Sequence, residues 1–123
     1  MTYTFNRNEY KTLVSCLSCA IEYADKRCAE TVGEDEMVYR FAASMWHECR
    51  KVKENMRRTH GVFFRDNSEK TLRMTEDTFE TVLCAIDYAL CASARNFFLT
   101  EIEEHPEFVQ NAEALRKKLT ESA

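Results

Sequence analysis

The chain has 123 residues, of which 45% are aliphatic, aromatic or cysteine residues and 31% are charged, with a net charge of −4. This balance is too apolar for a disordered chain and is typical of one soluble globular domain with one core. With only two glycines and one proline, the chain lacks the turn residues that β-sandwiches, barrels and α/β folds need. We therefore predict a single all-α domain over residues 1–123.

The first predicted helix runs from about residue 6 to residue 30. Asn6 and Glu9 have the spacing of a capping box, with Asn in the place of Ser or Thr. Apolar residues then recur at intervals of three and four, which places them on one helical face. These residues are Tyr10, Leu13, Val14, Leu17, Ile21, Ala24 and Cys28.

A turn and a second helix follow. Gly33 allows a left-handed turn, and Thr31 with Glu34 again has capping-box spacing. The second helix is predicted from about residue 34 to residue 58, with acidic residues at its start and arginines at its end, as the helix dipole favours. Its apolar face is predicted to hold Val38, Phe41, Met45, Cys49, Val52 and Met56.

Residues 59–74 break the helical pattern. A short apolar run, Val62–Phe64, follows Gly61 and precedes a turn-rich stretch. The pattern is compatible with a small β-hairpin and with an irregular ordered loop, and it does not separate the two.

Two more helices are predicted after this connection. One runs from about Thr75 to Phe97, and the other begins near Pro106, which suits the first turn of a helix. The expected fold is a four-helix, bundle-like arrangement of two helical hairpins joined by residues 59–74.

A hexapeptide occurs twice in the chain. Residues 19–24 read CAIEYA and residues 84–89 read CAIDYA, and the apolar positions around both copies stay in phase. An internal duplication with pseudo-twofold symmetry would explain this, as would the ordinary reuse of small and large apolar residues in amphipathic helices. In either case we expect the repeat to form the central contact between the hairpins, with packing favoured over chemistry for its Cys and Tyr residues.

The cysteines are predicted to be reduced thiols. There are six of them, and five lie within helical patterns among core-type residues. The chain starts without a secretory signal pattern, and no apolar run is long enough to span a membrane. These features favour a cytoplasmic protein without disulfides and without a membrane partner.

The sequence shows no catalytic or cofactor motif. Cys16, Cys19, Cys28, His47 and Cys49 have the residue types of a zinc site, but the tight Cys-x-x-Cys knuckles of structural zinc are absent. No phosphate-binding glycine loop and no nucleophile elbow are present. We therefore expect neither an enzyme nor a bound metal or cofactor.

The charge is distributed unevenly along the chain. Residues 50–73 contain eight Lys and Arg against three Asp and Glu, a net charge of +5, whereas the remaining residues have a net charge of −9. Such asymmetry can steer a charged partner. Phe63 and Phe64 lie within this segment and suit either base stacking or, as favoured here, closure of the open end of the bundle. The predicted partner-binding residues are Arg50, Lys53, Arg57, Arg58, Phe63, Phe64, Arg65 and Arg73.

The leading functional expectation is a small cytosolic protein-interaction module. By size and charge it is comparable to phage and mobile-element proteins that inhibit nucleic-acid-processing enzymes. One alternative is direct nucleic-acid binding through residues 50–73, against which the overall acidity argues. A second alternative is a small-molecule or metal site between the helices near Cys19 and Cys84. A homodimer is a further option, through Met45 with Trp46 or through Phe97 with Phe98.

Overall fold

The computed structural model describes residues 1–60, 68–95 and 106–121. These residues form four helices and two short strands. In chain order they are β1 (Thr2–Phe5), α1 (Arg7–Thr31), α2 (Glu36–His60), β2 (Lys70–Arg73), α3 (Glu76–Ala94) and α4 (Pro106–Glu121). No helix in these ranges is long and apolar enough to cross a membrane.

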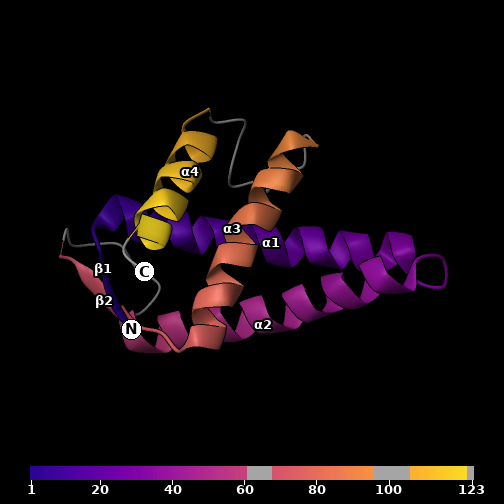
Figure 1. Ribbon diagram of the computed structural model, residues 1–123, viewed down its shortest axis with the longest axis horizontal. Coiled ribbons are helices and arrows are strands. Elements are labelled where there is room, and N and C mark those ends of the chain that lie inside the picture. Colours follow the sequence, from indigo (N-terminus) through magenta and orange to yellow (C-terminus); the bar gives the residue numbers. More distant parts are fainter. Residues whose placement is uncertain (61–67, 96–105, 122–123) are drawn as a thin grey trace.

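The helices form two hairpins that cross each other. In Figure 1, α1 and α2 run lengthwise, α3 runs across both of them, and α4 crosses α1 near its start. The central element is α1, which contacts each of the other three helices, and α3 also contacts α2 and α4. The predicted all-α, bundle-like fold is confirmed. The turn of the α1–α2 hairpin extends beyond α3 in this view (Figure 1).

The start of α1 is capped as predicted. The backbone N–H of Glu9 donates to the Asn6 side chain at 2.8 Å, and the Asn6 N–H donates to the Glu9 carboxylate at 2.9 Å. This reciprocal pair satisfies two backbone donors that the first turn of a helix leaves without partners. The box also orients β1, because the strand ends at the residue before Asn6.

The turn between α1 and α2 differs in detail from the prediction. Gly33 has a φ of +76°, the expected left-handed conformation. Thr31, however, is the last residue of α1, and its hydroxyl donates to the Arg27 carbonyl at 2.6 Å. The second helix instead begins behind Asp35, whose carboxylate accepts from the N–H of Val38 at 3.2 Å. The capping role expected for Thr31 therefore belongs to Asp35.

The connection predicted over residues 59–74 contains strand β2, which pairs with the N-terminal strand β1. Strand β2 lies antiparallel to β1, with Tyr3 opposite Leu72, and the two strands form the only sheet of the described residues. The segment was expected to form either a hairpin of its own or a loop, and pairing with the N-terminus was not anticipated. Residues 61–67 lie outside the described residues, and α2 continues to His60 rather than ending near Arg58.

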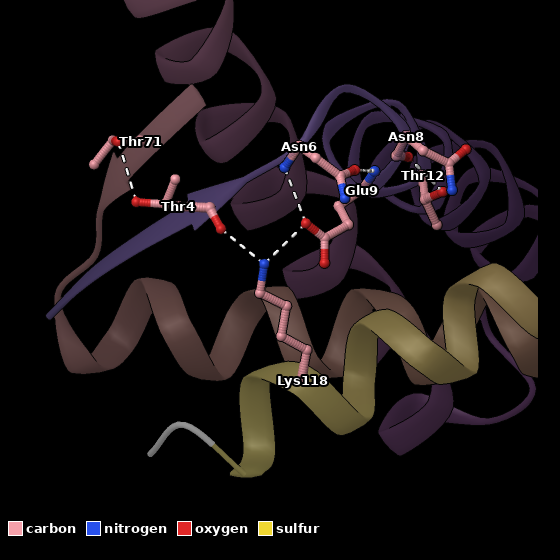
Figure 2. A network of polar contacts seen from close by, with 7 residues as sticks. All are labelled: Thr4, Asn6, Asn8, Glu9, Thr12, Thr71 and Lys118. Carbon is pink, nitrogen blue, oxygen red and sulfur yellow. Dashed lines mark hydrogen bonds and ion pairs between the residues drawn. The ribbon is translucent and has the colours of Figure 1, made fainter. Parts of the chain in front are cut away.

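The last helix is tied to the N-terminal strand by one lysine. The Lys118 ammonium donates to the Thr4 carbonyl and to the Glu9 carboxylate, both at 2.8 Å (Figure 2). It also lies 5.4 Å from the centre of the Phe5 ring, which is fully buried. The carboxylate that completes the α1 capping box thus also binds α4, so that β1, α1 and α4 meet at one polar cluster beside the core.

The core contains side chains from all four helices and both strands. Its largest fully buried members are Phe5, Leu13, Leu17, Met56, Ile86, Leu115 and Leu119. The alanines of the repeated hexapeptide, Ala20, Ala24, Ala85 and Ala89, are also fully buried. Small residues allow helix backbones to approach closely, and α1 and α3 are in contact. The repeat therefore lies at a central helix contact, as expected.

Candidate interaction surfaces

Four of the predicted partner-binding residues lie on one half of α2. Arg50, Lys53, Arg57 and Arg58 are all exposed, as is Arg73 in β2. The remaining three predicted residues, Phe63, Phe64 and Arg65, lie outside the described residues. We use the name basic face for the exposed side chains of Arg50, Lys51, Lys53, Arg57 and Arg58.

An open groove of about 660 Å³ follows the basic face. We refer to it as the Trp46 groove; its lining consists of Trp46, His47, Arg50, Lys51, Glu54, Asn55 and Arg58. The indole of Trp46 is half-buried against the core, and the Arg50 guanidinium carbon lies 4.5 Å from the ring centre. This cation–π contact holds a planar cation over an aromatic surface at the molecular boundary.

A second groove lies between the end of α2 and the sheet. It has a volume of about 420 Å³ and is lined by Thr2, Asn55, Thr59, Thr71, Leu72 and Arg73. Asn55 lines both grooves. The structure thus places Arg50 and Arg58 at the first groove and Arg73 at the second, whereas Lys53 and Arg57 line neither groove.

Carboxylates partly neutralise the basic face. Glu48 lies 3.6 Å from Lys51, and Glu54 lies 3.6 Å from both Arg57 and Arg58. These pairs are exposed, so each adds little to stability. Their effect on recognition is larger, because the surface offers cations and anions side by side rather than a uniform positive stripe.

The two tyrosines of the repeat meet at a different surface. The rings of Tyr23 and Tyr88 lie 5.0 Å apart between centres, and Phe41 packs against Tyr88 at 5.6 Å. Arg95 donates to the Tyr23 hydroxyl at 2.9 Å. Burial, reinforced by the neighbouring Tyr23, raises the pKa of Tyr88 to about 12, an increase that nearby Arg27 partly offsets. Both phenols of this pair are therefore held at a helix contact edged by two arginines.

The aromatic cluster opens into a groove of about 410 Å³ between α1, α2 and α3. We name it the tyrosine groove; it is lined by Tyr23, Arg27, Met37, Val38, Phe41, Tyr88, Cys91 and Arg95. Sequence reasoning assigned Phe41 to the buried face of α2, but its side chain is 50% exposed. One side of its ring packs against Tyr88 of α3, and the other side faces the open groove.

The two cysteines of the repeat differ in their exposure to solvent. Cys19 is buried, whereas Cys84 is exposed. Cys91 is exposed as well, so the expectation that the helical cysteines behave as core residues is wrong for Cys84 and Cys91.

The buried thiols are poor nucleophiles at neutral pH. Burial raises the pKa of Cys16, of Cys19 to about 11 and of Cys49 to about 12. Desolvation also raises the pKa of exposed Cys84, where the Asp87 and Glu80 carboxylates add to it. A catalytic cysteine requires the opposite shift. None of the six cysteines forms a disulfide bond.

No group of three or more His, Cys, Asp or Glu side chains in the described parts of the chain is arranged to hold a metal ion. Comparison of the chain with protein families, with curated proteins and with solved structures found no match.

Proposed function

We propose that the protein is a small interaction module that docks on an acidic surface of another protein through its basic face and the Trp46 groove. The observation that carries the proposal is Trp46 with Arg50 above it in an open groove. Trp and Arg are the residues most enriched at the energetic centres of protein interfaces. The half-buried indole is fixed by the core, so little side-chain entropy is lost when a partner covers it.

The mixed charge of the basic face favours a protein over a nucleic acid as the partner. A nucleic acid presents phosphates along its whole length, and Glu48 and Glu54 would repel them. A protein surface presents both signs, so it can pair with Arg50 or Arg58 and also accommodate Glu54. The net charge of −9 outside residues 50–73 further opposes binding to a polyanion.

Capture from native cytosol with three immobilised chains tests the proposal. The chains are the unaltered protein, Arg50→Glu and the control Lys117→Glu, which reverses an exposed basic side chain on α4. We expect at least one protein to be retained by the unaltered and control chains. The amount of this protein that the Arg50→Glu chain retains is expected to be at least tenfold lower. Equal retention by all three chains would contradict the proposal.

Direct nucleic-acid binding through residues 50–73 is distinguished by labelled RNA and DNA at low salt. Binding that falls steeply with salt and is lost in Arg50→Glu but retained in Lys117→Glu would replace our proposal with this alternative. We expect no binding by any of the three chains, in keeping with the charge argument above.

The narrower form of the proposal is that the partner is a nucleic-acid-processing enzyme that the protein inhibits in the cytosol. Six free thiols favour a reducing compartment, and acidic faces outside the basic face would compete with nucleic acid for a basic groove on such an enzyme. The captured protein, once purified, is expected to lose nucleic-acid affinity when the unaltered chain is added and to keep it when Arg50→Glu is added.

A further inference from the structure

The turn end of the α1–α2 hairpin carries most of the exposed apolar side chains. Of the five large apolar side chains exposed in residues 1–60, 68–95 and 106–121, four lie between residues 32 and 41. Met37 is 83% exposed and Val32 is 60% exposed. Clustered apolar surface of this kind marks interaction sites in soluble proteins.

This apolar surface continues into the tyrosine groove. Met37 and Phe41 line the groove, and the packed rings of Tyr23 and Tyr88 complete its aromatic lining. The groove shares no lining residue with the Trp46 groove. It is therefore a separate surface, and an inference about it goes beyond the function proposed above.

Opposite charges flank the same surface. Arg27 and Arg95 line the groove, and no acidic residue does. The three residues directly before Met37 carry exposed carboxylates, of which Asp35 also caps α2 and Glu36 also pairs with Arg40 at 2.6 Å. A surface with an apolar centre, bases on one side and acids on the other becomes complementary to itself after a twofold rotation, which is the requirement for an isologous dimer.

We propose that the protein forms a twofold-symmetric dimer through this surface. The acidic turn of each copy faces Arg27 and Arg95 of the other copy, and Met37 of each copy packs against the other's tyrosine groove. A second copy fits better than an unrelated acidic segment because the chain itself places an exposed thioether, that of Met37, directly after three carboxylates. The dimer leaves both basic faces exposed, so it offers two docking surfaces.

Sedimentation equilibrium of the full chain measures this association. We expect a dissociation constant on the order of 10 µM, because the surface is small for a protein interface. Met37→Glu is expected to raise the dissociation constant at least tenfold, whereas the control Lys117→Glu leaves it unchanged. A chain that remains monomeric at about fifty times that concentration, or a dimer unaffected by Met37→Glu, would overturn the proposal.

The twofold arrangement makes a sharper demand on charge reversals. Arg27→Glu places like charges opposite each other in both halves of a symmetric interface, and Glu34→Lys does the same. Each variant alone is therefore expected to have a dimer dissociation constant at least tenfold higher than that of the unaltered chain. Mixing the two variants restores opposite charges in both halves, and the mixture is expected to dimerise about as tightly as the unaltered chain. Circular dichroism verifies that both variants are folded.

Absence of recovery in the mixture would refute the twofold pairing. This outcome is independent of the capture experiment, because neither Arg27 nor Glu34 lies on the basic face. The docking function is therefore tested by Arg50→Glu, and the dimer is tested by Met37→Glu and by the paired charge reversals.

Discussion

At the scale of single residues, equivalent positions of the repeat have acquired different surroundings. Cys19 is buried within α1 and Cys84 is exposed on α3, although both are followed by the same alanine and isoleucine. Tyr23 and Tyr88 meet because both lie where α1 and α3 approach closely. Residue type thus determines what a side chain can do, and the neighbouring helix determines which of those roles it takes.

The left-handed turn at Gly33 provides a prediction at this scale. A Cβ at this position would meet nothing within 4 Å, so Gly33→Ala should suffer only the cost of a left-handed backbone, about 1 kcal/mol. Gly33→Asn should cost less, since Asn tolerates this conformation. Urea unfolding at a concentration well below the dimer dissociation constant measures both. Equal free energies of unfolding for the unaltered chain and Gly33→Ala would argue against a positive φ at residue 33.

At the scale of elements, the one difference within the repeat holds two helices together. Asp87 on α3 accepts two hydrogen bonds from Arg116 on α4, at 2.6 and 3.1 Å. These bonds raise the pKa of the Arg116 guanidinium. The equivalent residue of α1 is Glu22, which is exposed and has no ion pair with another described residue. The copy of the repeat that has Asp in place of Glu is therefore the copy that binds α4.

The repeat supplies its own control for this contact. Asp87→Asn is expected to lower the free energy of unfolding by about 0.5–1 kcal/mol, because the pair is bidentate but partly exposed to solvent. Glu22→Gln, the same chemical change at the equivalent position, is expected to have no measurable effect. Thermal or urea unfolding compares the two variants. Equal losses in both would mean that the Asp87–Arg116 pair does not stabilise the fold.

At the scale of the whole molecule, the buried thiols couple stability to alkaline pH. Their folded-state pKa values are raised above the ordinary value of 9.0, to about 11 for Cys19 and about 12 for Cys49, and Cys16 is raised as well. Above pH 9 the unfolded chain releases these protons while the folded chain retains them. The stabilisation is therefore complete below pH 9 and is lost as the pH rises toward the folded-state values.

We expect the free energy of unfolding to fall by about 1.4 kcal/mol per buried thiol for each pH unit above 9. Urea unfolding between pH 7 and 10.5 under reducing conditions measures the slope. Cys49→Ala should reduce the slope by about one third, and Cys91→Ser, at an exposed position, should leave it unchanged. A flat profile across this range would show that these thiols do not titrate differently in the folded and unfolded chains.

The sequence by itself determined the four helices and the capping box at the start of α1, because both depend on residues within a few positions of each other. The three-and-four spacing of apolar residues and the pairing of Asn6 with Glu9 are local, and the observed ends of α1 differ from the predicted ones by one residue. The uneven distribution of charge along the chain also followed from the sequence, since it requires only a count of Lys, Arg, Asp and Glu in each segment.

Only the tertiary structure decided the features that join distant parts of the chain. The pairing of β1 with β2 links residues about seventy positions apart, and no local pattern in either strand specifies the other. Spacing showed that Phe41 shares a helix face with Met45, but only the crossing of the helices leaves Met45 5% exposed and Phe41 50% exposed. The tyrosine groove and its arginines arise from that same crossing, which is a non-local property of the fold.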